Sequence, residues 1–393
     1  MAVLVIGVST QIGLEIIRSL GKEGVEVYAA GPGKHQLGFY SKYTKKKFLL
    51  PFSPEERFID ELLQILKSNS EIKYLIAISE RNLTVLNKYR EELENYVRLL
   101  FPPQEILDYA LDRRKTLEVA QKLGIPIPET VFLDRFEDIE KAKNLPFPVI
   151  TKPAARDFKH PAQNELDFRI KYFDHYENLK EHIAFFKDSG WFPMIQTCCH
   201  GEEVGFAIIM ARGKPVTCFQ YWNQHLSPVQ GGVPILRESI PIDPEIKEYS
   251  ITLLKGIGWE GVAEIDYIRD HRDGRYKLLE INGRFWGGTP LPSKAGLPFP
   301  WLLYRALAKG EDFYTEDYQV GIRCCLLGGE ISRFLEILRS PSNTFGFSKI
   351  QATTEFLKLF LDPSTKFDIQ DWRDFLPGLV DIGQMFKKLL TKR

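Results

Sequence analysis

The sequence has few cysteines, no long apolar run and no excess of charge of either sign, and each absence excludes a class of protein. Five cysteines in 393 residues, four of them in adjacent pairs, do not form a disulfide framework, and no Cys-x-x-Cys spacing suggests zinc. No run of about 18 apolar residues exists, so we expect no membrane span. Basic and acidic residues both number 52, unlike a dedicated nucleic-acid binder. We therefore expect a cytoplasmic globular protein.

The first hundred residues alternate strand and helix patterns. Residues 3–6 form a continuous apolar strand, helical spacing follows from Ile12 to Leu20, and 25–30 and 74–78 are further strands. The apolar start lacks a basic leader, which favours a buried strand over a signal peptide. These patterns predict a doubly wound parallel-sheet domain.

The rest of the chain changes character twice. A strand-rich stretch runs from about residue 194 to 284, and the last 75 or so residues have helical spacing. We predict an α/β chain with a parallel-sheet domain at residues 1–105, α+β regions at 106–193 and 194–315, and a helical C-terminal extension at 316–393.

Acidic side chains on two consecutive predicted strands are the most informative feature. Glu264 and Asp266 stand two apart on one strand, and Glu280 and Asn282 stand two apart on the next, so each pair shares a face. Asp266, Glu280 and the Asn282 amide oxygen suit Mg²⁺ or Mn²⁺. Arg284 would then hold a phosphoryl group. A solvated hairpin is the alternative, but it explains poorly an asparagine that follows an apolar run.

This hairpin resembles the nucleotide–metal hairpin of the ATP-grasp superfamily, whose return strand reads Glu-x-Asn-x-Arg. In that family the first-strand acid stands four residues before a second acid or amide at the turn, as Asp266 stands before Asp270. The resemblance therefore assigns Asp266 as a metal ligand and leaves Glu264 as a same-face neighbour near the substrate.

Two basic residues match positions that meet ATP phosphate in the family. Arg113 stands eleven residues before Gly124, where many members carry lysine. For Arg113 alone, a surface charge at a helix N-terminus is an equal alternative. Lys152 ends an apolar strand directly before a proline, as the second phosphate-binding lysine does.

The segment 194–203 resembles the hinge between the two halves that clasp ATP. The resemblance implies that backbone groups around Gln196, Thr197 and Cys199 read adenine and that Glu203 accepts the ribose hydroxyls. The thiols of Cys198 and Cys199 are better explained as inert packing, because nothing basic surrounds them in the sequence.

The lid departs from the family pattern. Residues 154–161 contain no glycine, whereas most members cover the phosphates with a glycine-rich loop. Backbone N–H groups could still hold phosphate, and Arg156, Lys159 or Lys171 could add charge. An ordinary surface loop explains these three residues equally well.

Other landmarks resemble the carboxylate–amine ligase branch, which includes D-aspartate ligase and shares its fold with biotin carboxylase and the large subunit of carbamoyl phosphate synthetase. Substrate-facing positions of that branch match Ser79, Glu80, Gly231, Gly232 and Trp286. The resemblance implies catalytic roles for Arg237, Asn282 and Arg284. It also implies ATP and Mg²⁺ as cofactors, a small-molecule carboxylate and amine as substrates, an acyl phosphate intermediate, and ADP as product.

Alternatives remain open. A carboxylase acting through carboxyphosphate shares the fold, and the glycine-poor lid leaves room for a non-catalytic ATP-binding protein. A nicotinamide dehydrogenase is disfavoured because residues 7–13 are not Gly-x-Gly-x-x-Gly. A homodimer is the default assembly. We expect the amphipathic tail, 375–393, to be a packing helix with a solvated cationic end rather than a membrane-surface helix.

Overall fold

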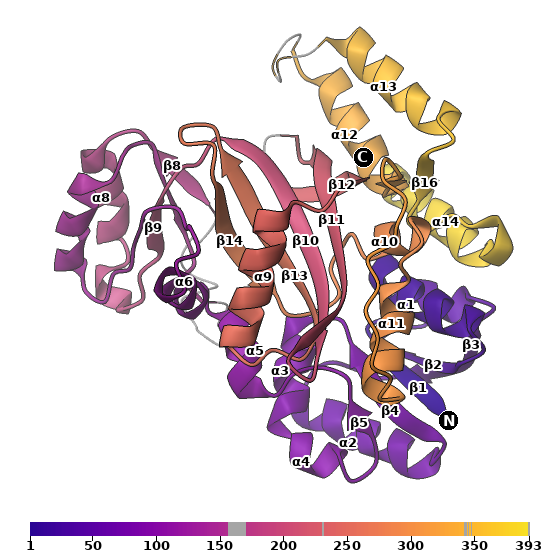
Figure 1. Cartoon of the computed structure of the whole chain (residues 1–393). Helices are drawn as coiled ribbons and strands as arrows, with labels where there is room; N and C mark the ends of the chain where they lie inside the picture. The colour runs from indigo at the N-terminus through magenta and orange to yellow at the C-terminus, as the bar shows by residue number, and fades with distance from the viewer. Residues whose placement is uncertain (156–169, 230–231, 342–343, 345, 347, 392–393) are drawn as a thin grey trace.

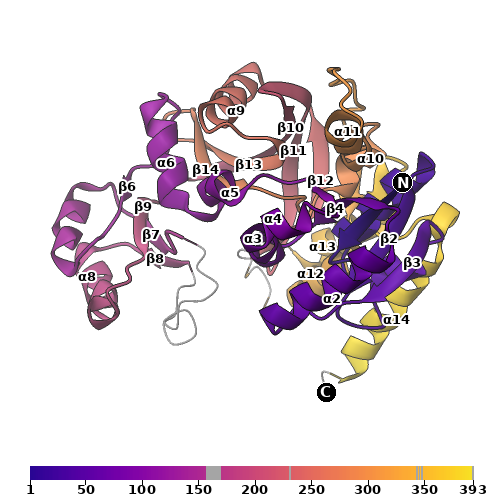
Figure 2. The same cartoon turned by 90° about the horizontal axis from the view of Figure 1, so that it is seen from below.

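The computed structural model describes the chain except residues 156–169, 230–231, 342–343, 345, 347 and 392–393. Its strands form three sheets. A four-stranded sheet with α8 (Tyr176–Ala184) lies at one end, and the N-terminal domain and the C-terminal helices lie at the other, with the largest sheet between them (Figures 1 and 2). The described helices include none long and apolar enough to cross a membrane.

The N-terminal domain is a parallel sheet with helices on both faces, as predicted. Its strand order is β3-β2-β1-β4-β5, with bounds Thr44–Leu49, Glu26–Gly31, Ala2–Ile6, Ile72–Ala77 and Arg98–Leu99. Helix α1 (Gln11–Lys22) covers one face, and α2 (Glu55–Ser68), α3 (Glu80–Lys88) and α4 (Arg90–Leu93) cover the other. Strand β1 is apolar throughout because both of its faces are buried. Two short elements complete this part, η1 (Leu37–Tyr40) and α5 (Gln104–Leu111).

The central sheet has the order β14-β13-β10-β11-β12-β15-β16 and is antiparallel except for its last pair. Its first five strands in this order are Tyr276–Asn282, Gly261–Asp270, Gly201–Ala211, Lys214–Ser227 and Val233–Ile240. Helix α9 (Pro244–Gly256) packs its apolar side on the alternate residues Phe206, Ile208 and Ile265. Because side chains alternate across a strand, the residues between them point to the opposite face, where Ala207 and Ile209 of β10 belong to a second buried cluster.

The smaller sheet has the order β6-β9-β7-β8, with bounds Thr130–Val131, Met194–Thr197, Val149–Lys152 and Lys171–Phe173. Helix α6 (Arg113–Lys122) begins where the Asp112 side chain accepts hydrogen bonds from the N–H groups of Arg114 and Lys115. The remaining elements of this region are η2 (Phe136–Asn144) and η3 (Lys187–Ser189). Most of the predicted lid lies outside the described residues.

The C-terminal extension is not purely helical, which corrects our prediction. Strands β15 (Arg323–Cys325) and β16 (Thr365–Phe367) extend the central sheet. Three residues are too few to show strand periodicity in a sequence. The helical elements beyond β14 are α10 (Pro290–Lys294), α11 (Phe299–Leu303), η4 (Tyr304–Ala308), α12 (Leu327–Arg339), α13 (Lys349–Leu361), η5 (Trp372–Asp374) and α14 (Leu376–Thr391).

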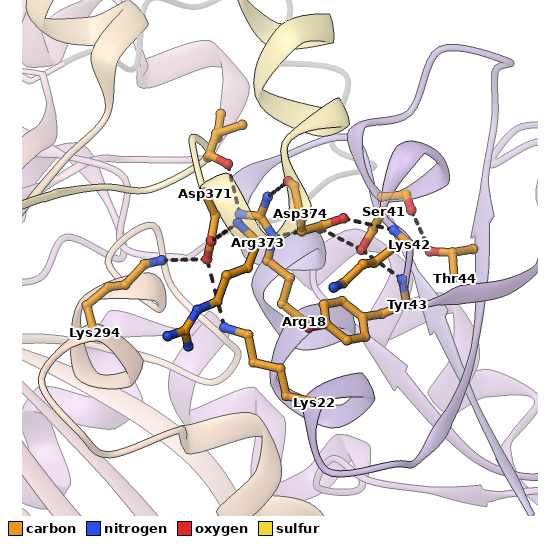
Figure 3. A network of polar contacts seen from close by, with 12 residues as sticks. Arg18, Lys22, Ser41, Lys42, Tyr43, Thr44, Lys294, Asp371, Arg373 and Asp374 are labelled. Atoms are coloured by element: carbon orange, nitrogen blue, oxygen red, sulfur yellow. Dashed lines mark hydrogen bonds and ion pairs between the residues drawn. The ribbon is translucent and has the colours of Figure 1, made fainter.

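A buried ion pair fastens the extension to the N-terminal domain. Arg18 of α1 donates from Nε to the Asp374 carboxylate at 2.9 Å, and both side chains are almost fully buried. Two further Arg18 N–H groups donate to the carbonyls of Ile369 and Asp374 (Figure 3). On the other side, Ser41 Oγ and the backbone N–H of Lys42 donate to the same carboxylate. The N-terminal domain and the C-terminal extension are therefore packed together through Asp374.

Candidate active site

Strands β13 and β14 bring the predicted metal ligands together. In their antiparallel register Asp266 lies opposite Glu280, and Glu264 lies opposite Asn282. All four side chains share the face away from α9, because the intervening residues Ile265 and Ile281 are buried in the core. The spacing-based prediction of one acidic cluster therefore agrees with the register.

The Asn282 amide links the two acids of β13. Its Nδ2 donates to Glu264 at 2.7 Å and to Asp266 at 3.1 Å. Burial raises the pKa of Asp266 well above its usual value, and the nearby charges of Glu264 and Glu280 raise it further. Burial also raises the pKa of Glu264. Crowded, buried carboxylates of this kind are chemically suited to a divalent cation.

Tyr221 of β11, which sequence reasoning missed, completes this cluster. Its hydroxyl donates to Glu264 at 2.5 Å, and burial beside the acids raises its pKa. The ring reaches across β10 at Gly205, where a Cβ atom would lie 2.1 Å from it. Gly205 is also the partner of Asp266 in the sheet. A glycine in a buried strand beside an acidic strand was the available signal.

Two cations face the acids. Arg113, at the first turn of α6, donates from Nε at 2.7 Å and from an Nη at 2.5 Å to one oxygen of Glu280. A further Nη donates to the Pro153 carbonyl at 3.2 Å. The Arg113 side chain is therefore in the site and paired with a predicted metal ligand.

Lys152, at the end of β7, is 9% exposed. Burial and, to a lesser extent, the Arg113 charge lower the pKa of its ammonium to about 8, although the nearby Glu280 charge opposes them. The described part of the chain gives this ammonium no hydrogen bond or ion pair. A buried cation without a partner fits a binding site for an anion such as phosphate.

Arg284 lies just beyond the acidic cluster. Its Nε is 3.2 Å from Glu80, and an Nη is 3.4 Å from the Asn282 side-chain oxygen. Glu80 begins α3, whose N-cap Ser79 accepts a hydrogen bond from the Asn82 N–H. The predicted substrate residues Ser79 and Glu80 thus lie beside the predicted phosphoryl clamp.

The predicted adenine hinge is largely occupied by internal hydrogen bonds. The N–H groups of Thr197 and Cys198 donate to the carbonyls of Glu129 and Pro148, and the Gln196 side chain donates to Thr130. Within the described residues, the Cys199 N–H donates to no other backbone group. The hinge residue with an amide left for a base is therefore Cys199.

The side chains around the hinge differ in their setting. Burial raises the pKa of the Cys199 thiol to about 11, which fits the expectation of inert packing. Partial desolvation raises the pKa of Glu203, which remains at the solvent rim of β10. Lys171 lies on the edge strand β8 opposite Thr151. Arg156 and Lys159 lie outside the described residues.

Two residues that we predicted to face the substrate, Arg237 and Trp286, are buried in the structure. Arg237 is 1% exposed, and its Nη atoms donate to the Gly287 carbonyl at 2.6 Å and to Asp368 at 2.5 Å. Trp286 is buried and stacked on Tyr221, with ring centroids 6.2 Å apart. With these contacts Arg237 positions the Gly287 turn, and its catalytic role stays a prediction. The stacking on Tyr221 gives Trp286 a packing role.

The substrate-facing loop is only partly described. Gly231 lies outside the described residues. At Gly232 a Cβ atom would lie 2.2 Å from the Ser227 carbonyl oxygen, so the chain approaches itself closely there. Asp368, the partner of Arg237, comes from the C-terminal extension, which the sequence interpretation had not connected with the site.

The arrangement of a large, mainly antiparallel sheet, a smaller sheet, and a cluster of acids and cations between them is that of the ATP-grasp fold. The chain is related to the carboxylate–amine ligases of this fold. It is 26% identical over 185 residues to D-alanine–D-alanine ligase of Pseudomonas entomophila, which covers 44% of this chain and 54% of the relative. It is 23% identical over 268 residues to D-aspartate ligase of Enterococcus faecium, covering 62% of each. The matched segment thus spans about half of the first relative. No protein-family model matches the chain.

Solved structures agree on the fold. N5-carboxyaminoimidazole synthetase from Staphylococcus aureus superposes with a TM-score of 0.64 at 15% identity, over 82% of this chain and 80% of that one. L-amino acid ligase from Bacillus licheniformis superposes with a TM-score of 0.59 at 16% identity, over 79% of this chain and 74% of that one. At such low identity these likenesses establish the architecture alone.

Proposed function

We propose that the chain is an ATP-dependent ligase that joins a carboxylate to an amine through an acyl phosphate and releases ADP and phosphate. The observation that carries the proposal is the meeting of Arg113 and Lys152 with the acids Asp266 and Glu280 between two sheets. Cations for phosphate and oxygen ligands for a metal are what phosphoryl transfer needs, because it depends on charge neutralisation and positioning. Relatedness to D-alanine–D-alanine and D-aspartate ligases supports the choice of reaction.

The donor set fits MgATP. Asp266, Glu280 and Asn282 would hold the Mg²⁺ ion, which when bound would polarise the transferred phosphoryl group. The Asn282 amide now turns Nδ2 toward the acids, so its oxygen reaches a metal only after the amide rotates. Glu264 keeps its hydrogen bond from the Tyr221 hydroxyl whichever way the amide turns.

Arg113 and Glu280 neutralise each other in the structure. When the nucleotide binds, we infer that Arg113 turns to the phosphates and releases the Glu280 carboxylate to the metal. Each charge then exchanges one partner for another, and neither is left buried and unpaired. Lys152 gains the anionic partner that the described residues do not give it.

The remaining roles follow from position. Arg284 holds the transferred group or the acyl phosphate, with Glu80 fixing its guanidinium. Arg237 holds the Gly287 turn next to it. Hinge residues up to Cys199 contact the base and Glu203 the ribose. The substrates are a small-molecule carboxylate and amine, and we propose a cytoplasmic enzyme and a homodimer.

Incubation with ATP, Mg²⁺ and a panel of amino acids, followed by mass spectrometry, tests the proposal. We expect an amide product together with ADP and phosphate. Product formed equally well without ATP, or AMP in place of ADP, would contradict it. Glu280→Gln should abolish product formation, and Glu202→Gln is its matched control: it makes the same change at an exposed β10 residue that pairs with His271, and it should keep full activity.

A carboxylase-type reaction is the second candidate, because the fold alone does not distinguish it from a carboxylate–amine ligase. ADP release that depends on bicarbonate and not on an amine would favour it. Tight ATP binding without turnover on either panel would instead favour a non-catalytic ATP-binding protein.

A further inference from the structure

Within residues 376–387, whose side chains the structure describes, helix α14 has a packed side and an exposed side. Val380 lies against the buried cluster of Leu14, Leu37 and Ile369, which belongs to the N-terminal domain and the segment before η5. The opposite side leaves large apolar side chains in solvent. Leu376 is 47% exposed, Leu379 58% and Phe386 63%. Their spacing of three and seven residues places them on one helix face.

Two aromatic residues continue this face in front of the helix. Trp372 in η5 is 82% exposed and Phe375 is 58% exposed. We call the five side chains the docking face: Trp372, Phe375, Leu376, Leu379 and Phe386. Large aromatic side chains rarely remain this exposed without an apolar environment to enter.

Cations border the docking face. Arg373 is exposed and stands between Trp372 and Phe375 in the sequence. Lys42 is also exposed, and its backbone N–H donates to Asp374, the residue after Arg373 (Figure 3). Two of the neighbouring acids are paired with other cations, and Asp381 of α14 accepts a hydrogen bond from Gln370. Asp374 is buried against Arg18, and Asp371 lies 3.2 Å from Lys294.

The adjoining edge of the N-terminal sheet is also basic. Residues 31–50 contain five lysines and no acid, in a chain whose total charge is zero. Lys47 of edge strand β3 is aligned with Ala29, whose side chain packs on the α1 side of the sheet, where Val380 of α14 packs beside Leu14 of α1. Lys47 is therefore on the same side as α14, whereas Lys46 is aligned with Tyr28 on the other face and pairs with Glu71.

We propose that the docking face binds the surface of an anionic phospholipid bilayer. Trp, Phe and Leu enter the boundary between headgroups and acyl chains, while Lys and Arg remain among anionic headgroups. This goes beyond the proposed ligase reaction and does not depend on it. We expected the tail to be a packing helix rather than a membrane-surface helix. Helix α14 does pack through Val380, but its exposed apolar face leads us to propose that it also binds a membrane surface.

The charge argues against a second copy as the occupant. A twofold contact brings the same patch of two chains together, so two basic borders would face each other. An anionic bilayer complements both the apolar and the basic part of the surface.

Sedimentation of the full-length protein with vesicles tests the proposal. We expect binding to vesicles of phosphatidylcholine with phosphatidylglycerol, weaker binding at high salt, and little binding to phosphatidylcholine alone. The double variant Leu379→Glu with Phe386→Glu should lose more than about tenfold in affinity, since two apolar side chains no longer enter the bilayer. Its thermal unfolding should match the parent, because both side chains are exposed.

Leu357→Glu is the matched control. Leu357 is 55% exposed on α13, outside the docking face, so the same substitution there should leave vesicle binding unchanged. The proposal is overturned if the parent protein does not bind anionic vesicles, if both variants bind equally, or if the double variant abolishes a dimer seen by analytical ultracentrifugation instead.

Discussion

The pKa of Lys152 gives a quantitative prediction for nucleotide binding. Burial lowers this pKa from 10.5 to about 8. A difference of about 2.5 units corresponds to roughly 3 kcal/mol disfavouring the charged ammonium in the empty site. A bound phosphate favours the charged form, so it should raise the pKa again. Binding at a pH above 8 therefore includes uptake of a proton.

The sign of the pH dependence follows directly. Below pH 8 the free site already carries the charge, and affinity should be nearly flat. Above pH 8 the free lysine is neutral, so the dissociation constant of MgADP should rise by about tenfold per pH unit until the pKa of the complex is reached. Isothermal titration calorimetry from pH 7 to 10 measures this. Near pH 8, buffers of different ionisation enthalpy should show uptake of about half a proton.

Lys152→Arg is the matched variant, because a guanidinium keeps its charge throughout this range. It should bind MgADP with little dependence on pH above 8. The reasoning is refuted if the parent affinity is flat from pH 7 to 10, or if Lys152→Arg retains the full slope.

Three further changes test other parts of the structure. Glu280→Gln should abolish turnover and leave the circular dichroism spectrum unchanged, so an active variant would exclude Glu280 as a metal ligand. Arg18→Ala should lower the free energy of unfolding by about 3–5 kcal/mol in denaturant titration, because it leaves the Asp374 carboxylate buried without its partner. Arg57→Ala, at an exposed pair, should change it by less than about 1 kcal/mol. Cys199→Ser should keep turnover within about twofold, since its protonated thiol is no nucleophile at neutral pH; a complete loss would contradict the packing role.

Local patterns were sufficient to predict the N-terminal parallel-sheet domain and the acidic hairpin, whereas the ATP-grasp fold was predicted from the family resemblance. Residue spacing alone places Glu264 with Asp266 and Glu280 with Asn282, and antiparallel pairing then brings the two pairs together. Continuous apolar strands between amphipathic helices likewise predict a parallel sheet. Both inferences use contacts between neighbouring elements.

Contacts between distant segments could not be predicted in the same way. Arg113 and Glu280 are 167 residues apart, and no sequence pattern shows that they pair without nucleotide. The ion pair between Arg237 and Asp368 also forms only because the C-terminal extension packs against the central sheet. Tyr221 reaches Glu264 only because Gly205, on the strand between them, has no side chain. The assignment of individual residues to ATP, metal and substrate stays a prediction.

The central claim is that a carboxylate takes the terminal phosphoryl group of ATP before the amine attacks. Amino acids carrying ¹⁸O in their carboxyl groups test it most directly. Supplied with ATP and Mg²⁺, the enzyme should release phosphate that contains one ¹⁸O atom for each amide formed. Amide formation with unlabelled phosphate, or with AMP as the nucleotide product, would contradict the account.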